Sequence, residues 1–347
     1  MHRSRVLLTT FLFVFLLTFA PAGQASPPGD MADPQTGYRI YLPFIAYGPP
    51  LPSTPLQVHM INVGQGNSYL IVAPSGKTML IDTGESSQAS VVANYLQSAL
   101  GVKAVDFVVI THYHADHLGA FTDLVNTHGM VINQATYDRG GSRTEYNSAT
   151  YTDYYDHCTT TNPAACKRTT LHEGDAIDLG PTVQAKVLCI GDLVTKKTCG
   201  QSVKSENDNS ALILLSMGSF DIWLGGDTSG DTTHVSYADV ESAVVSQGKV
   251  NQTLDVYAVD HHGSCTSSNQ TLIDATHPTV SVFSLGANSY GHPCPATVNR
   301  LTTAGSTLYY TENASGALVD GNVKIVYNGG TTYTVTTTKG MTTFNTK

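Results

Sequence analysis

The sequence predicts a single α/β domain. Short runs rich in β-branched and aromatic residues alternate with segments whose apolar residues recur at helical spacing. This pattern fills about 290 residues from position 56 onward, which is enough chain for one large hydrophobic core. Histidine and acidic residues directly follow several of the predicted strands. We therefore expect an α/β domain with a polar site where these strands end.

Residues 1–25 have the features of a secretory signal peptide. Two arginines precede an apolar run over residues 6–20, and small residues suitable for cleavage follow it. A membrane-spanning helix needs about twenty apolar residues, so this run is short, although an uncleaved anchor is the alternative. Residues 26–55 are rich in proline and predict a linker, in which the apolar segment 38–47 could instead pack as an edge strand. We therefore expect a secreted chain with no transmembrane span after cleavage.

The elements of the domain, expected over about 56–338, follow in order. Residues 90–100 have helical spacing, and Gly101 is a residue that commonly ends a helix. Near the carboxyl end, Asn328-Gly-Gly330 predicts a turn between two strands. Strands are predicted over 56–62, 68–72, 77–81, 106–110, 205–215 (where a polar turn leads into the strand), 220–227, 254–259, 280–285 and within 316–338, and helices over 90–100, 118–125, 239–246 and 296–304.

A histidine-rich loop follows the strand predicted over 106–110. His112, His114, Asp116 and His117 lie close together in the sequence, and the turn after a buried strand lets their side chains converge. Neutral imidazole and carboxylate groups bind divalent metal ions, and positions left open on such an ion hold water. A polar surface loop is the alternative interpretation. The sequence therefore predicts a metal site at this loop.

Other strands end in residues of the same chemistry. Asp82 follows the strand 77–81, Asp227 ends the stretch 220–227, and His261 and His262 follow the strand 254–259. An aspartate in the position of Asp82 could instead cap the next helix. His292 lies in a turn after the strand 280–285, where it could face the site or be held only by hydrogen bonds within the turn.

A tyrosine-rich stretch is expected to be an insert at about residues 133–172. It has little periodicity and contains five tyrosines, at 137, 146, 151, 154 and 155. Long loops inside a compact domain are often lids or binding loops, and tyrosine rings can stack on bases, sugars or other flat groups. The alternative is an insert whose tyrosines cover a small core of its own.

The six cysteines predict three disulfides, because an exported chain meets oxidising conditions. Six cysteines allow fifteen pairings, and we favour the one in which each bridge ties a local loop. A cysteine metal ligand is the alternative, although no Cys-x-x-Cys motif occurs. The favoured pairs are Cys158 with Cys166, Cys189 with Cys199, and Cys265 with Cys294, the last of which would clamp the 261–262 loop to the 292 loop.

Seven motifs together resemble the metallo-β-lactamase fold superfamily, whose signature is His-x-His-x-Asp-His. Within it, the chain looks most like the metallo-hydrolase domain of ComEC-type competence proteins and their stand-alone relatives. The resemblance covers about residues 56–335. The matching stretches are Asn62-Val-Gly-Gln-Gly-Asn-Ser68, Leu80-Ile-Asp-Thr-Gly84, the histidine loop, Asn207-Asp-Asn-Ser210, Gly225-Gly-Asp227, His261-His-Gly-Ser264 and Tyr290-Gly-His-Pro293.

The resemblance implies an αββα sandwich, with two mixed β-sheets back to back and helices outside, that carries one or two divalent ions. Zinc is favoured by the ligands and the family, and manganese is possible because oxygen ligands are many. A metal-bound hydroxide would be the nucleophile. The metal ligands implied are His112, His114, Asp116, His117, Asp227 and His262.

The resemblance also implies roles around the ions. Asp82 would orient ligands from beneath the site, and Asp116 would both ligate and orient the nucleophile. His262 is favoured over His261 as the ligand, although the reverse assignment is open, and His261 would then contact ligands or substrate. His292 would give a proton to the leaving group or bind a phosphate oxygen.

The chain departs from many relatives at Asn207-Asp-Asn-Ser210, where they carry a further histidine ligand. ComEC-like members share this Asn-and-Ser pattern. Asn209 or Ser210 could hold a water or a substrate oxygen instead, and a simple tight turn is an equally good explanation.

The expected function is a secreted metal-dependent phosphodiesterase or nuclease of the ComEC-like type. The chain has 18 basic and 27 acidic side chains and no basic run, so we expect a nucleic-acid substrate to be short or weakly bound. A lactonase, β-lactamase or phosphocholine esterase of the same fold is the nearest alternative. A non-catalytic extracellular binding module with a structural metal is an alternative of another class. The sequence predicts no oligomeric state.

Overall fold

The computed structural model describes residues 54–230, 233 and 236–347. The predicted signal peptide (residues 1–25) and all but the last two residues of the predicted proline-rich linker (26–55) lie outside the described residues. Among the described residues, no helix combines the length and apolar character needed to cross a bilayer.

The first sheet is mixed and runs in the order β18-β17-β16-β1-β2-β3-β4-β5-β6. Strands β3 to β6 are parallel, whereas the remaining neighbours pair antiparallel. Strand β18 lies beyond the predicted end of the domain at residue 338, so the sheet continues further than the sequence indicated. Its strands are β1 (Leu56–Met60), β2 (Tyr69–Val72), β3 (Thr78–Ile81), β4 (Ala104–Val109), β5 (Val131–Asp138), β6 (Arg168–Thr170), β16 (Val323–Tyr327), β17 (Thr332–Thr337) and β18 (Gly340–Asn345).

The second sheet is also mixed and runs in the order β15-β14-β13-β12-β11-β8-β7, with β12 to β15 parallel. A two-stranded ribbon of β9 (Lys197–Thr198) and β10 (Gln201–Ser202) stands apart. Five of these strands, β7, β8, β9, β10 and β15, were not predicted from the sequence. The strands are β7 (Ala176–Ile177), β8 (Gln184–Cys189), β11 (Leu212–Met217), β12 (Phe220–Leu224), β13 (Val256–Ala258), β14 (Val280–Phe283) and β15 (Thr307–Tyr310).

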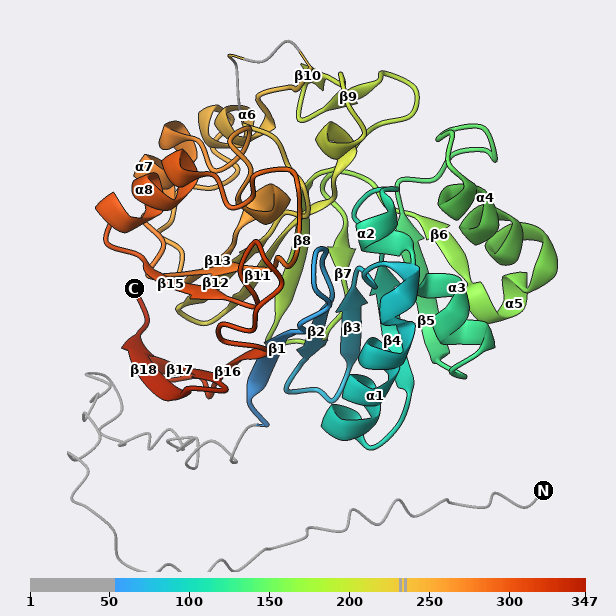
Figure 1. Cartoon of the computed structure of the whole chain (residues 1–347), viewed down its shortest axis with the longest axis horizontal. Helices are drawn as coiled ribbons and strands as arrows, with labels where there is room; N and C mark the ends of the chain where they lie inside the picture. Colours follow the sequence, from blue (N-terminus) through green and yellow to red (C-terminus); the bar gives the residue numbers. More distant parts are fainter. Residues whose placement is uncertain (1–53, 231–232, 234–235) are drawn as a thin grey trace, which may run out of the picture. The chain divides into compact units, whose positions relative to one another are not determined.

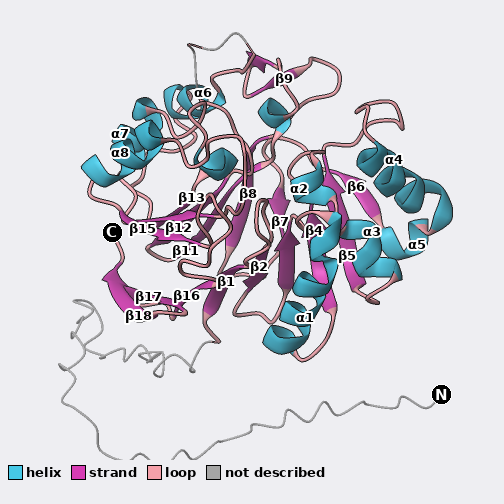
Figure 2. Ribbon diagram, in the orientation of Figure 1, coloured by secondary structure: helices cyan, strands magenta, loops and turns pink. Residues whose placement is uncertain are grey.

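Helices cover the outer face of each sheet (Figures 1 and 2). Helices α1, α3 and α4 pack on the first sheet, and α6, α7 and α8 pack on the second. The predicted αββα sandwich is therefore confirmed. The helices are α1 (Ala89–Leu100), α2 (Ala115–Leu118), α3 (Phe121–Asn126), α4 (Ala149–Asp156), α5 (Pro163–Cys166), α6 (Val240–Ser246), α7 (Gln270–Thr276) and α8 (Pro295–Thr303), with short 3-10 turns at Ser86–Gln88, Asn207–Asn209 and Asp260–Gly263 and a π-helical turn at His157–Thr161.

The two-residue period of the strands explains the layers. In β2, Tyr69 and Ile71 face the core between the sheets, whereas Leu70 between them faces the helices. Burying a large apolar side chain contributes about 1.5–3 kcal/mol. Both faces of the central strands are buried in this way, which explains why they are nearly continuous apolar runs in the sequence.

The tyrosine-rich insert is more regular than the sequence suggested. Its two ends are β5 and β6 of the first sheet, and α4 and α5 lie between them. Tyr151 and Tyr154 are fully buried, with the ring of Tyr151 4.3 Å from that of Tyr113 and Tyr154 packed edge-on against Phe121. Most of the insert therefore forms a core of its own, and only part of it reaches the pocket described below.

All six cysteines form disulfides, in the pairs Cys158–Cys166, Cys189–Cys199 and Cys265–Cys294. No thiolate is therefore available as a metal ligand.

Candidate metal centre

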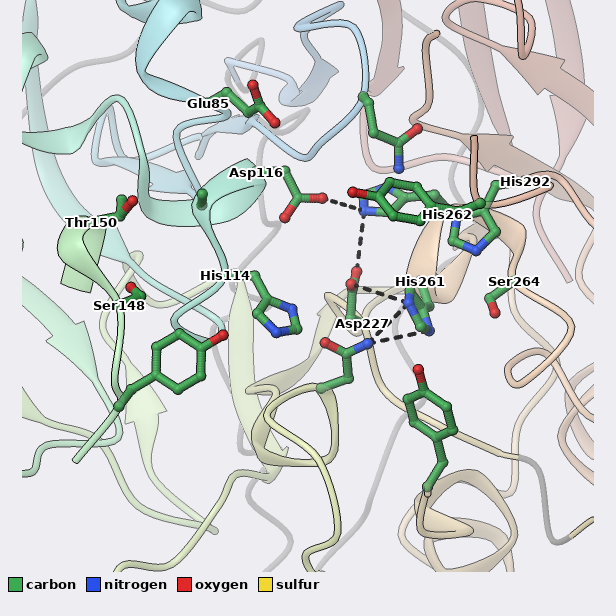
Figure 3. A pocket seen from close by; sticks show the side chains of 16 residues that line it. Glu85, His114, Asp116, Ser148, Thr150, Asp227, His261, His262, Ser264 and His292 are labelled. Carbon is green, nitrogen blue, oxygen red and sulfur yellow. Dashed lines mark hydrogen bonds and ion pairs between the residues drawn. The ribbon is translucent and has the colours of Figure 1, made fainter. Parts of the chain in front are cut away.

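The candidate ligands lie where parallel strands of both sheets end. The histidine loop follows β4, Asp227 follows β12, and the turn with His261 and His262 follows β13. Parallel strands bring their carboxyl ends to one edge of a sheet, and ligands bind in the crevice outside such ends. Figure 3 shows the result, with labelled side chains from both halves of the sandwich pointing toward one another: His114, Asp116, Asp227, His261, His262 and His292.

Two groups of potential ligands come together at this edge. Within each group, one nitrogen or oxygen atom from every residue lies within 4.8 Å of the others. All six residues that the family resemblance implied as ligands belong to one of them. The groups are His112, His114 and Asp227, and Asp116, His117 and His262.

Asp227 belongs to the first group but also contacts the second, so that each of its oxygens faces histidines of a different group. Its Oδ1 is 3.1 Å from His117 Nε2 and 3.4 Å from His262 Nε2. Its Oδ2 is 3.7 Å from His112 Nε2. A carboxylate in this position can contact two metal ions at once, as in sites whose ions are about 3.5–4 Å apart.

The residues fit divalent ions for a second reason. His117 Nε2 and Asp227 Oδ1 are fully buried, and their contact lacks hydrogen-bond geometry, so neither atom has a hydrogen-bond partner. A buried polar atom without a partner costs about 1–3 kcal/mol. A cation bound between the two atoms would remove this cost, so the donor set suits a metal.

The histidines and carboxylates of the two groups shift each other's pKa values. Burial would lower the pKa of His117, but the carboxylates of Asp227, Asp82 and Asp116 raise it well above its ordinary value. Burial would likewise raise the pKa of Asp116, and His117 and His262 hold it below its ordinary value. Without metal these side chains therefore pair with one another, and metal binding must displace protons.

Asp82 holds the His117 ring from behind. Its Oδ2 is 2.7 Å from His117 Nδ1, and its two oxygens accept hydrogen bonds from the backbone N–H and the hydroxyl of Thr111, each at 2.8 Å. The carboxylate thereby directs His117 Nε2 toward Asp227. This contact is the orienting arrangement that the resemblance implied, and ligating histidines are commonly held in this way.

His261 and His262 share a strained turn but face different groups. Both have positive φ angles, of 50° and 53°, which non-glycine residues rarely adopt. His262 lies 3.1 Å from Asp116 Oδ2, and its other nitrogen is 2.8 Å from the Ser284 carbonyl oxygen. His261 Nε2 lies 3.7 Å from Asp227 Oδ2, the oxygen that faces His112. The two histidines therefore reach opposite oxygens of Asp227.

The turn that lacks the family histidine contributes Asn207 rather than Asn209. Asn207 Nδ2 is 2.9 Å from His261 Nε2, and its side chain lines the pocket. Asn209 lies behind it and donates to Glu206, whose other oxygen accepts the N–H of Tyr113 in the histidine loop. Ser210 accepts a hydrogen bond from the Asp227 backbone N–H. Asn209 and Ser210 thus support the loops rather than face a substrate.

His292 faces the same pocket from the loop after β14. Its ring centroid is 5.2 Å from that of His261, and its Nδ1 is buried without a hydrogen-bond partner. Burial, together with His261 and His262, lowers the pKa of His292 to about 4. The Cys265–Cys294 disulfide joins this loop to the turn of His261.

The candidate ligands open into a pocket of about 640 Å³, within the range of about 300–1,000 Å³ that is usual for small-molecule sites. Some of its further lining residues lie in the motifs or are among the tyrosines noted in the sequence, whereas Glu85, Ser148, Thr150 and Tyr237 were not predicted, because no local pattern marks them. Beside the residues already described, Gln65, Glu85, Ala115, Tyr146, Ser148, Thr150, Tyr237, Ser264 and Tyr290 line the pocket.

Comparisons with known proteins agree with this geometry. Residues 61–132 match the model of the metallo-beta-lactamase superfamily. The chain is 28% identical over 280 residues to competence protein ComA of Neisseria gonorrhoeae, covering 79% of this chain and 34% of that protein. It is 25% identical over 315 residues to ComE operon protein 3 of Bacillus subtilis, covering 84% of this chain and 36% of that protein. The chain therefore spans about a third of the length of these relatives.

Among solved structures, the metallo-beta-lactamase fold protein YhfI from Bacillus subtilis matches with a TM-score of 0.47 and 13% identity, over 77% of this chain and 100% of that chain. The family match covers the histidine loop, and the competence proteins align over most of the chain. The chain matches the metallo-β-lactamase superfamily over residues 61–132 and is a distant homologue of ComA- and ComEC-type competence proteins over most of its length.

Proposed function

We propose that this chain is a secreted metal-dependent phosphodiesterase that acts on extracellular nucleic acid. The observation that supports this most is the pair of ligand groups on either side of Asp227, both facing one pocket. Paired metal sites of this kind serve phosphodiester hydrolysis in phosphatases and nucleases. The motifs shared with the ComEC-type hydrolase domain support the choice of a nucleic-acid phosphodiester among possible substrates.

Zinc is the proposed metal, with manganese as the alternative. Bound divalent ions would polarise a phosphoryl oxygen and lower the pKa of a water molecule. The donor set of imidazoles and carboxylates suits zinc, and its carboxylate oxygens also suit manganese.

The residues of the chain would divide the remaining work. In hydrolysis one ester P–O bond breaks, the water oxygen forms a new P–O bond, and a proton ends on the leaving alcohol. Asp116 faces the pocket and could orient the attacking water, while Asp82 keeps His117 in place. His292 is neutral near pH 7 because of its lowered pKa, so it suits hydrogen-bond donation to a phosphate oxygen better than proton transfer to the leaving group.

The proposed function is tested by metal content and hydrolysis measured on one preparation. Bound zinc and manganese are counted per molecule, and cleavage of bis(p-nitrophenyl) phosphate and of DNA oligonucleotides is followed. We expect metal-dependent cleavage that Asp116→Asn reduces by at least about 100-fold. The matched control is Asp178→Asn, which changes an exposed carboxylate outside the pocket lining that contacts Lys77 and accepts the Gly180 N–H.

The other outcomes are distinct. Bound metal without cleavage of any phosphodiester would overturn the phosphodiesterase and point to lactone, lactam or other ester substrates. Absence of bound metal would overturn the metal-dependent mechanism altogether. Secretion is tested separately by N-terminal sequencing of protein from the culture medium, and retention of residues 1–25 on cell-associated protein would contradict it.

A further inference from the structure

The pocket offers no basic side chain to a polyanion. None of the described residues that line it is lysine or arginine, and its charged members besides histidine are the acids Glu85, Asp116 and Asp227. A protein that grips several phosphates does so with lysine and arginine. Phosphates beyond the one at the metal groups would therefore find no cation in this pocket.

The arginines of the neighbouring insert are already paired with acids. Arg139 contacts both Glu145 and Glu206, and its side chain is almost completely buried. Arg143 pairs with Asp156 through two hydrogen bonds. Because each guanidinium already has a carboxylate partner, neither is free to bind the backbone of a nucleic acid.

Three tyrosines lie beside histidines of the pocket instead. Their rings lie 5.7–6.0 Å from histidine rings: Tyr146 from His114 (5.8 Å), Tyr237 from His261 (6.0 Å) and Tyr290 from His292 (5.7 Å). They come from three distant parts of the chain, the insert, the segment before α6, and the loop after β14.

Tyr290 is unusual because 74% of its surface is exposed although its ring is aromatic. An aromatic ring that is exposed and lines a pocket offers a ligand a flat apolar surface. Burial raises the pKa of Tyr146 and that of Tyr237, so both phenols stay neutral near pH 7. The three tyrosines thus offer flat, uncharged surfaces beside the ligand groups.

We propose that this site takes single-stranded nucleic acid and recognises it by stacking unpaired bases on Tyr146, Tyr237 and Tyr290, with a single phosphate held at the ligand groups. This inference rests on the phosphodiesterase proposed above. Every base has a flat face, so stacking on aromatic rings tolerates any sequence. In a duplex the bases are already stacked and paired, and extracting one costs free energy. The enzyme therefore selects unpaired strands, and it does so without a basic groove.

The test compares substrates and variants in the same assay. An oligonucleotide with one phosphodiester flanked by methylphosphonate linkages keeps the bases but removes the other charges. We expect its kcat/KM to stay within about 3-fold of the all-phosphodiester strand, and abasic sites on both sides of the phosphodiester to lower kcat/KM about 5- to 100-fold. For the natural strand, log(kcat/KM) should fall with log[salt] with a slope no steeper than about −1.4, as for two phosphates or fewer.

Tyrosine variants then assign the effect to the pocket. Tyr290→Ser should raise KM for single strands about 5- to 100-fold, and Tyr290→Phe should retain wild-type KM because the ring remains. Met341→Ser is the matched control, since it removes an exposed apolar side chain from β18 outside the pocket lining. Tyr237→Ser provides a second variant from another part of the chain.

The outcomes separate this inference from the proposed function. Duplex cleaved as fast as single strands, or Ser variants equal to wild type on oligonucleotides that are cleaved, would overturn the stacking proposal and leave the phosphodiesterase standing. Cleavage of glycerophosphocholine but of no oligonucleotide would also overturn it, because aromatic rings in a pocket that also contains Glu85 can hold a quaternary ammonium group. Failure to cleave bis(p-nitrophenyl) phosphate or any oligonucleotide would instead refute the proposed function.

Discussion

Replacing Asp82 by asparagine should weaken metal binding without unfolding the domain. Asparagine keeps the size of the side chain and tolerates the positive φ of 58° at this position, so the backbone is not strained further. The change removes the negative charge 2.7 Å from His117 Nδ1. A hydrogen bond to a charged group contributes about 1.5–3 kcal/mol, which corresponds to about 10- to 150-fold in a binding constant. Loss of an orienting partner behind a ligating histidine typically costs 10- to 100-fold in metal affinity, roughly the same range.

The assay is a competition titration of metal-stripped protein against a chromophoric chelator. We expect one of two bound equivalents to weaken about 10- to 100-fold in Asp82→Asn. Asp106→Asn is the matched control, because Asp106 also joins β3 to β4, through the Thr78 N–H at 2.8 Å, but at the opposite ends of these strands. An affinity of Asp82→Asn within about 2-fold of wild type would refute the idea that this carboxylate orients a metal ligand.

Three further changes have defined outcomes. Adding a chelator should lower the unfolding temperature by about 5 °C or more if metal is present at about 100 times its Kd, and a calorimetric scan that does not move would contradict a bound metal. Burial raises the pKa of Glu241 from 4.5 to about 7, so its contribution to stability is complete below about pH 4.5 and is lost as the pH rises through about 7. The free energy of unfolding of the metal-free wild type should therefore fall across this pH window, whereas that of Glu241→Gln should depend less on pH. An equal pH dependence of the two free energies would exclude this role. Replacing both Cys265 and Cys294 by serine opens a loop of 29 residues and should cost about 3–4 kcal/mol in denaturant titrations, with a loss below about 1 kcal/mol counting against it.

The ligand groups could be predicted because their signal is local. His112 and Asp227 each follow a mostly buried strand by a few residues, and a parallel strand places such residues at one edge of its sheet. Both the strand and the ligand residue that follows it can therefore be recognised in one short stretch of sequence. The same reasoning places His262, although it does not separate that residue from His261.

The rest of the pocket could not be predicted because it depends on contacts between distant segments. Tyr146 and Tyr151 lie five positions apart in one tyrosine-rich stretch, yet Tyr146 lines the pocket and Tyr151 is fully buried. Tyr146 precedes helix α4 and Tyr151 lies within it, and eight residues are too short a span for periodicity to mark which face of the helix is buried. The motif at 207–210 does not show which of its residues faces the pocket, and in the structure that residue is Asn207. Tyr237 also lines the pocket, and no motif of the sequence includes it.

The positive φ of His261 allows the backbone strain in this turn to be measured. A non-glycine residue in the left-handed region costs about 1–2 kcal/mol, whereas glycine lowers stability by about 0.5–1 kcal/mol through the greater freedom of the unfolded chain. At an ordinary position alanine is therefore the more stable of the two. His261→Ala and His261→Gly both remove the imidazole ring, and they differ only in the Cβ atom at a position where φ is 50°. We expect the glycine variant to be more stable than the alanine variant by up to about 1 kcal/mol in metal-free denaturant titrations. An alanine variant of equal or greater stability would show that the turn holds these histidines without strain.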